Sequence, residues 1–91
     1  MMKKRDRLGV LYDILNIIKN NKNSIRPTPL LRASNLSSSR FSDYYTDLLK
    51  KGLIREIVDK EDNKFISLTD KGFKFLEKYN IILGFIEEFG L

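Results

Sequence analysis

The sequence predicts a mainly α-helical fold with one small β-hairpin (α+β). Two features of the apolar pattern indicate it. Apolar residues recur at three- and four-residue steps over most of the chain, and the pattern changes to two short apolar segments around a charged turn at residues 53–68. The third observation is size, because 91 residues support only one modest core. A hydrophobic fraction of 42% is that of a folded chain. We therefore expect one compact unit.

Two helices are expected in the N-terminal part of the chain. From Asp6 to Asn20 the apolar residues follow helical spacing, and the polar run from Asn20 to Ser24 ends the helix. A second helix of about two turns is expected from Thr28, which can cap it, and Pro29, which suits the first helical position.

A third helix and a hairpin follow. The serines at 37–39 are N-cap candidates for a helix that reaches Lys51, and its buried stripe is predicted to be Phe41, Tyr44, Tyr45, Leu48 and Leu49. Gly52 stands where a left-handed residue ends a helix. Residues 53–58 and 64–68 are apolar segments separated by the charged turn formers 59–63, which predicts a hairpin.

The last helix is predicted from about Asp70 to Glu88, with Thr69 as its cap and Gly90 at its end. It carries apolar residues on several faces, more than a domain of this size can bury alone. A second copy of the chain is the simplest partner. We therefore expect a homodimer in which residues 70–91 form the dimerisation helix and residues 1–69 the remaining domain of the same compact unit. The expected interface residues are Phe75, Leu76, Tyr79, Ile82, Leu83, Ile86 and Phe89.

The order helix, helix, turn, helix, hairpin, helix is that of the winged helix-turn-helix, here with a long C-terminal dimerisation helix. Charge is distributed unevenly along this order. Residues 1–40 hold nine Lys and Arg against two Asp, whereas residues 41–91 have a net charge of −2. Such asymmetry favours a polyanionic partner, with nucleic acid ahead of a membrane surface. A merely solvated basic surface is the alternative.

Three stretches carry a resemblance to a known family. They are TPLLRASNL at 28–36, YTDLLKKGLI at 45–54 and LTDKGFKFL at 68–76. With the long terminal helix behind them, the sequence resembles the archaeal ten-kilodalton winged-helix DNA-binding proteins. These proteins dimerise through an antiparallel coiled coil of their C-terminal helices. The resemblance implies the winged-helix fold, this mode of dimerisation and double-stranded DNA as the ligand.

In a helix-turn-helix the third helix enters the major groove and the second crosses the sugar-phosphate backbone. Arg40 is the leading candidate for a base or phosphate contact, because its planar donors suit guanine edges and phosphate oxygens alike. The small hydroxyl side chains around it predict modest sequence preference. The turn at 59–64 is the candidate wing, or else an ordinary solvated turn. The candidate DNA-binding residues are Arg26, Arg32, Ser38, Ser39, Arg40, Ser42, Thr46, Lys50, Lys60, Asn63 and Lys64.

The N-terminus adds a basic arm, formed by Lys3, Lys4, Arg5 and Arg7, which is either a further DNA contact or a solvated terminus. The chain contains no His and no Cys. With no Gly-rich phosphate loop and no metal-ligand cluster either, we expect neither an enzyme nor a cofactor or metal. No apolar run is long enough for a membrane span, so we expect a cytoplasmic, nucleoid-associated protein.

The sequence therefore predicts a homodimer that binds double-stranded DNA as a transcription regulator or chromatin-associated protein. The alternative is a winged-helix module that binds other proteins and not DNA. Asp43 and Asp47 keep this alternative open, because both lie in the third helix, where carboxylates would repel phosphate if they faced the groove.

Overall fold

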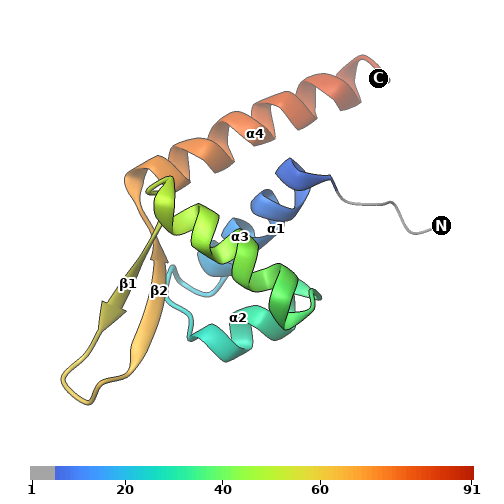
Figure 1. Ribbon diagram of the computed structural model, residues 1–91. Coiled ribbons are helices and arrows are strands. Elements are labelled where there is room, and N and C mark those ends of the chain that lie inside the picture. The colour runs from blue at the N-terminus through green and yellow to red at the C-terminus, as the bar shows by residue number, and fades with distance from the viewer. Residues whose placement is uncertain (1–5) are drawn as a thin grey trace.

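A computed structural model describes residues 6–91 and shows four helices with one two-stranded antiparallel hairpin, which confirms the predicted fold class. In Figure 1, α4 runs across the top of the molecule, α3 crosses in front of α1, and the hairpin extends away from the helices. Of the basic arm, Lys3, Lys4 and Arg5 lie outside the described residues. The elements are α1 (Arg7–Asn20), α2 (Pro27–Ser34), α3 (Ser38–Lys50), β1 (Ile54–Val58), β2 (Lys64–Leu68) and α4 (Asp70–Glu88).

Side chains cap three of the helices at their N-termini. The carboxylate of Asp6 accepts a hydrogen bond from the backbone N–H of Gly9, and the Ser37 hydroxyl accepts one from Arg40. The Thr69 hydroxyl caps α4 by accepting from the N–H of Gly72 at 3.1 Å. Each cap satisfies a backbone donor that has no partner within its own helix. The predicted caps of α3 and α4 are confirmed.

The prediction for the start of α2 was wrong. The helix begins at Pro27 with Arg26 in the N-cap position, so both the cap and the first helical residue lie two positions before the predicted Thr28 and Pro29. Ile25 forms a β-bridge with Ile66, with N–H to carbonyl distances of 3.2 and 2.8 Å in the two directions. This tertiary pairing fixes where the extended segment ends, and Pro27 then suits the first helical position because its φ is already helical.

The core forms where the inner faces of α1, α2, α3, the hairpin and the first half of α4 meet. Helix α3 contributes Phe41 and Leu48, while the other three members of its predicted stripe are half-buried and pack against the core. Because all five residues face inward, the opposite face of α3 is exposed. The buried apolar residues are Val10, Leu11, Ile14, Leu15, Ile18, Ile25, Leu30, Phe41, Leu48, Leu53, Ile54, Ile66, Leu68 and Leu76.

The hairpin pairs Ile54 with Leu68 at its base and Val58 with Lys64 at its tip. One carboxylate oxygen of Asp59 accepts hydrogen bonds from the backbone N–H groups of Glu61 and Asn63, both at 2.9 Å. These bonds hold the turn in one conformation and hold the pKa of Asp59 below its usual value, the N–H of Asn63 being the main cause.

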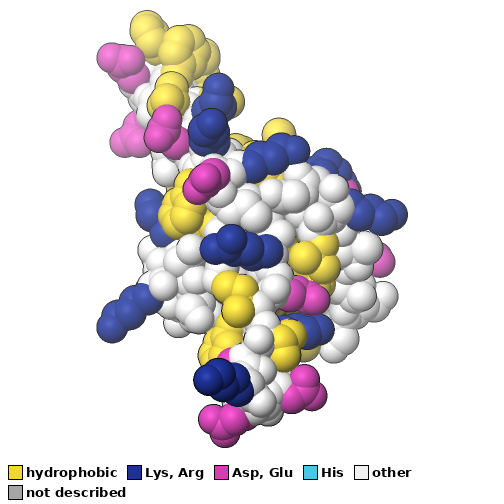
Figure 2. Space-filling model, turned by 90° about the vertical axis from the view of Figure 1, so that its left-hand side faces the viewer, with side chains coloured by type: hydrophobic (Ala, Val, Ile, Leu, Met, Phe, Trp, Pro, Cys, Tyr) yellow, Lys and Arg dark blue, Asp and Glu magenta, His cyan; other side chains and the backbone are white. Residues whose placement is uncertain are grey.

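The two halves of α4 differ in burial. Its first half belongs to the core, where Leu76 is 2% exposed. The inclusion of Leu76 in an interface with a second copy is therefore corrected, because the domain already covers this side chain. The second half projects beyond α1 (Figure 1), and hydrophobic side chains gather on this projecting end at the top of Figure 2. The exposed apolar residues of this half and of the three residues that follow it are Ile81, Ile82, Leu83, Phe85, Ile86, Phe89 and Leu91.

A small aromatic cluster fixes the angle between α4 and α1. The rings of Tyr12 and Tyr79 stack with centroids 4.6 Å apart, and Phe75 stacks on Tyr79 at 5.9 Å. The Tyr12 hydroxyl donates to the side-chain oxygen of Asn80 at 2.6 Å. The projecting half of α4 is therefore held in a defined direction relative to the helical domain.

Candidate nucleic-acid interface

The outward face of α3 is polar and exposed. With about 3.6 residues per helical turn, Ser39, Thr46 and Lys50 point directly away from the buried Phe41 and Leu48. Asp43 shares this outward face. Arg40 and Asp47 lie about a quarter turn to one side, toward α1, and Ser38 and Ser42 lie toward the hairpin. The face is therefore divided into a central strip and two flanks.

On the hairpin side, α3 is tied to the β-strands by a chain of polar contacts. The Tyr45 hydroxyl donates to a carboxylate oxygen of Glu56 in β1, and the same oxygen lies 3.4 Å from the ammonium group of Lys64 in β2. Burial raises the pKa of the Tyr45 hydroxyl, and the bond to Glu56 raises it further. These contacts set the position of the hairpin beside α3.

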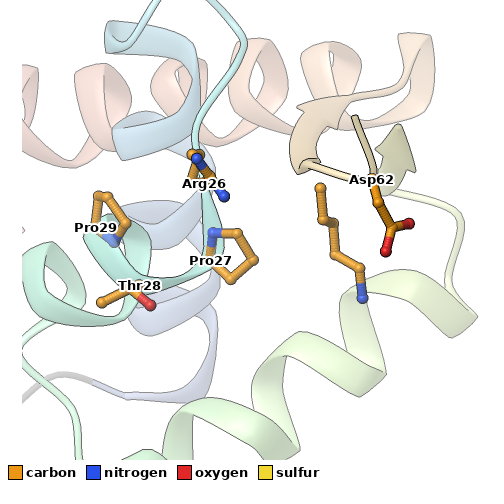
Figure 3. A pocket seen from close by; sticks show the side chains of 6 residues that line it. Arg26, Pro27, Thr28, Pro29 and Asp62 are labelled. Carbon is orange, nitrogen blue, oxygen red and sulfur yellow. The ribbon is translucent and has the colours of Figure 1, made fainter. Parts of the chain in front are cut away.

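A shallow groove of about 540 Å³ separates the start of α2 from the hairpin turn. Figure 3 shows Arg26, Thr28 and the two prolines on one side and Asp62 on the other. Lys64 also lines the groove. Two cations against one carboxylate make the groove a candidate contact for a backbone phosphate.

Arg26 connects the two sides of this groove. Its guanidinium donates to the side-chain oxygen of Asn63 at 3.1 Å and lies 5.8 Å from the centroid of the Phe65 ring. Asn63 in turn donates to Asp59 at 3.3 Å. Asn63 is half-buried, and its amide is used in bonds within the protein. Arg26 is exposed, and its guanidinium has further N–H donors for a ligand.

The hairpin tip is of mixed charge. Lys60 and its neighbours Glu61 and Asp62 are all exposed, and basic and acidic side chains sit together at the bottom of Figure 2. The two carboxylates oppose deep insertion of the tip between phosphates. Contacts from the wing are therefore expected beside the turn, at Lys64 in the first position of β2, and not at residues 60–62.

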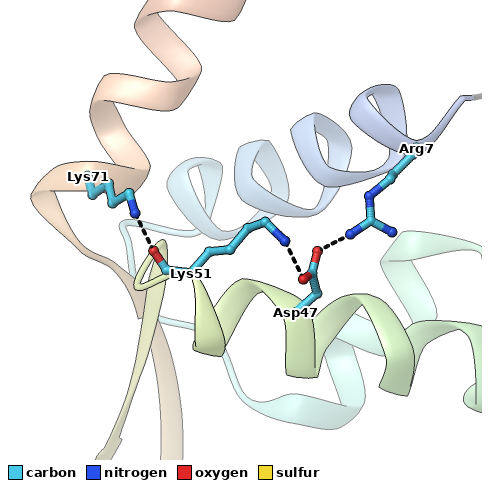
Figure 4. A network of polar contacts seen from close by, with 4 residues as sticks. All are labelled: Arg7, Asp47, Lys51 and Lys71. Carbon is cyan, nitrogen blue, oxygen red and sulfur yellow. Dashed lines mark hydrogen bonds and ion pairs between the residues drawn. The ribbon is translucent and has the colours of Figure 1, made fainter.

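Asp47, one of the two acidic residues of α3, is paired within the protein. Its carboxylate binds the guanidinium of Arg7, at the start of α1, and the ammonium of Lys51 (Figure 4). The bond from Lys51, followed by the charges of Arg7 and its lysine neighbours, holds the pKa of Asp47 below its usual value. Asp47 therefore presents, on the α1 flank, an ionised carboxylate whose charge is already paired with two cations.

The structure places the sequence-predicted residues on and beside α2, α3 and the hairpin. Arg32 is exposed in the last turn of α2. All eleven candidates are exposed except the half-buried Asn63. Sequence reasoning assigned Arg7 to a terminal arm, but it is the first residue of α1 and pairs with α3. No sequence signal joins residues 7 and 47, because only the packing of α1 against α3 brings them together.

A family model described as winged helix-turn-helix matches residues 4–86. The chain belongs to the winged helix-turn-helix family. The match includes the first five elements and α4 as far as Ile86, so the shared feature is the whole fold and not the helix-turn-helix alone. No curated protein sequence matches this winged helix-turn-helix chain.

Solved winged-helix structures resemble the chain over most of its length. The DNA-binding protein Sso10a-2 from Sulfolobus solfataricus superimposes with a TM-score of 0.74 at 19% identity, covering 93% of this chain and 85% of that one. A winged-helix DNA-binding protein from STIV gives 0.73 at 22% identity, with 88% and 91% covered. The transcriptional regulator PcaV from Streptomyces coelicolor gives 0.74 at 17% identity, with 87% of this chain but only 59% of that chain covered. At these identities the likeness shows the fold.

Within residues 6–91, no helix has the length and hydrophobicity that a membrane crossing requires.

Proposed function

We propose that this chain binds double-stranded DNA as a homodimer, in the role of a transcription regulator or chromatin-associated protein of the cytoplasmic nucleoid. One observation carries the DNA part of the proposal. The outward face of α3 is free of the protein's own packing and is flanked by cations from α2, α1 and the hairpin. A helix presented in this way can enter a major groove, with phosphate contacts on either side.

The chemistry of this face favours modest sequence preference. Ser39 and Thr46 offer hydroxyls, which bond phosphates and bases without strong discrimination. Lys50 adds a point charge. The pairing of Asp47 with Arg7 and Lys51 removes most of the repulsion that this carboxylate would exert on phosphate. Of the two α3 carboxylates that would oppose DNA binding, Asp43 alone then stays exposed on the outward face, which favours DNA as the ligand over a purely protein-binding role.

Dimerisation is supported by the projecting half of α4. Its large side chains stay exposed in the single chain, and an apolar surface of this kind marks an interaction site. We propose residues 70–91 as the dimerisation segment. The resemblance to the archaeal ten-kilodalton family favours an antiparallel coiled coil of two α4 helices, related by a two-fold axis.

The DNA proposal is tested by measuring affinity for a short duplex as a function of salt. We expect binding that weakens steeply as salt rises, because phosphate contacts release counterions. Lys50→Ala should weaken duplex binding. Lys19 is an exposed lysine outside the interface, so Lys19→Ala should change binding little. Failure to bind duplex at low salt, or an affinity that ignores salt, would contradict the proposal and leave the protein-interaction module as the function.

Light scattering tests the dimer. The intact chain should have twice the monomer mass at tens of micromolar, roughly the range of ordinary dimer affinities. A double change of Leu83→Glu and Ile86→Glu should yield a monomer, because it places charges in the apolar contact. Leu8→Glu is the matched control, since Leu8 is an exposed apolar residue on α1. A monomeric intact chain, or a variant that stays dimeric, would refute the interface.

A further inference from the structure

Four side chains surround a small hollow on the α1 flank of α3. Arg7 comes from the first turn of α1, and Arg40, Asp43 and Tyr44 come from the first half of α3. The hollow has a volume of about 220 Å³ and is open to solvent. It shares no residue with the groove of Arg26 and Lys64, which is lined by the start of α2 and the hairpin.

Arg7 is fixed in this hollow by a bond that uses only part of its hydrogen-bonding capacity. One terminal nitrogen of its guanidinium donates to Asp47, and the other is turned away from that carboxylate in Figure 4. A guanidinium has five N–H donors in a rigid plane, so further donors stay available to an anion. The Arg7 side chain is 61% exposed despite the ion pair.

Asp47 keeps its charge under ordinary conditions, because its pKa is held low by Lys51 first and by Arg7 second. Lys51 also shares this carboxylate. The ammonium group of Lys71, on α4, donates to the backbone carbonyl of Lys51 at 2.7 Å (Figure 4). The anchor for Arg7 is therefore built from α3 and supported from α4.

We propose that Arg7 and Arg40 together bind one backbone phosphate of the duplex, and that Asp47 is a positioning residue that holds Arg7 for this contact. This inference rests on the proposed DNA-binding function and deepens it. Arg40 lies a quarter turn from the outward strip of α3 and shares a hollow with a second guanidinium. Two guanidinium groups therefore line the hollow against the single carboxylate of Asp43, and guanidinium groups suit a phosphodiester, whose oxygens accept several charge-assisted hydrogen bonds.

The assignment changes the role of two residues. Arg40 becomes a phosphate contact, and base edges are left to the outward strip at Ser39, Thr46 and Lys50. Asp47, which by its charge alone would weaken DNA binding, becomes part of the binding surface. With the groove at Arg26 and Lys64, the protein then holds phosphates on both sides of the helix in the major groove.

The salt dependence of duplex affinity tests the two arginines. Arg7→Ala and Arg40→Ala should each reduce the slope of log affinity against log salt by up to about 0.9 per protomer. When salt rises from about 50 to 200 mM, the unmodified chain should therefore lose up to roughly three- to fourfold more affinity than either variant loses. The loss should be equal on duplexes of different sequence. Lys19→Ala is the charge-matched control and should leave the slope unchanged. An unchanged slope for Arg7→Ala, or a loss for Arg40→Ala that depends on sequence, would overturn the proposal.

Asp47→Asn tests the positioning role. If Asp47 only repelled phosphate, Asp47→Asn would tighten duplex binding. If Asp47 positions Arg7, the same substitution should weaken binding to about the level of Arg7→Ala. When Arg7→Ala is already present, Asp47→Asn should no longer weaken binding, since the residue to be positioned is gone. Arg7→Lys should recover only part of the affinity, because an ammonium lacks the planar donor set. Tighter binding by Asp47→Asn alone would refute the role.

The results of these experiments distinguish a wrong phosphate contact from a wrong DNA-binding function. If the unmodified chain does not bind duplex, both proposals fail. If it binds with a steep salt dependence that Arg7→Ala and Arg40→Ala leave intact, DNA binding stands and only the Arg7 and Arg40 contact is wrong. Circular dichroism of each variant, compared with Lys19→Ala, checks that the helices are retained.

Discussion

Replacing Gly72 with alanine should destabilise the protein by an amount that the structure allows us to work out. A Cβ at this position would lie 2.2 Å from the backbone carbonyl oxygen of Leu53, which is far inside contact distance. The same oxygen accepts the N–H of Thr69 at 3.1 Å, and the Thr69 hydroxyl donates to the carbonyl of Gly52 at 2.6 Å. Room for the methyl group can therefore be made only by moving α4 away from the end of α3.

The expected cost has two parts. Overpacking against rigid backbone costs about 1–3 kcal/mol. Weakening a hydrogen bond between Thr69 and the Gly52 to Leu53 segment adds about 1 kcal/mol. A total of about 2–4 kcal/mol is a large share of the roughly 5–15 kcal/mol by which such domains are stable. At about 4–8 °C per kcal/mol, the melting temperature should fall by at least about 8 °C.

Gly84→Ala is the matched control in the same helix. Nothing lies within 4 Å of a Cβ built at Gly84, so the change should stabilise α4 by about 0.5–1 kcal/mol through helix propensity alone. Thermal and urea denaturation should be followed by circular dichroism at one fixed protein concentration, because dimerisation makes stability depend on concentration. If Gly72→Ala were as stable as the unmodified chain, or shifted in the same direction as Gly84→Ala, the close approach of α4 to Leu53 would be refuted.

Three further predictions concern single side chains. Tyr45→Phe should make stability less sensitive to alkaline pH: the raised pKa of Tyr45 contributes stability that is fully present below its ordinary value of 10.0 and is lost as pH rises beyond it. Asp59→Ala should speed hydrogen exchange at the amides of Glu61 and Asn63, because their acceptor is removed. Ser37→Ala should cost about 0.5–2 kcal/mol by removing the cap of α3.

Each of these three predictions has a control measurement and an outcome that would contradict it. For Tyr45, urea denaturation at pH 9 and pH 11 should show a smaller drop in the variant than in the unmodified chain; equal drops would contradict the assignment. For Asp59, exchange in α1 should stay slow, and a turn that exchanges at its original rate would show that the bonds are dispensable. For Ser37, the control is Ser38→Ala, whose hydroxyl makes no cap, and equal losses in both variants would argue against capping.

Local patterns account for much of what the sequence predicts correctly. The stripe of Phe41 and Leu48 is visible as helical spacing, and Ser37 and Thr69 stand where a hydroxyl can reach the N–H three residues later. Gly52 has the left-handed φ of +70° that its place after α3 predicts. All of these depend on residues close in sequence, so spacing alone is enough to find them.

The predictions fail where a segment distant in sequence determines the start of a helix or the burial of a side chain. The start of α2 is set by the bridge between Ile25 and Ile66, forty-one positions apart, and not by the capping preference of Thr28. Leu76 follows the same spacing as the exposed residues after it, but β2 and α1 cover it in the folded chain. Burial of one half of a helix cannot be read from its periodicity, since periodicity defines a face and not what covers it.

The sequence by itself determines the order of the elements, the polar outward face of α3 and the excess of apolar residues on α4, because these follow from residue type and spacing. Only the tertiary structure decides which charges meet. Arg7 reaches Asp47 and shares a hollow with Arg40 because α1 packs beside α3, and Arg26 reaches Asn63 because Ile25 pairs with the hairpin. The physical reason is range: side-chain ion pairs and hydrogen bonds act over a few ångströms, and only folding brings residues forty positions apart within that distance.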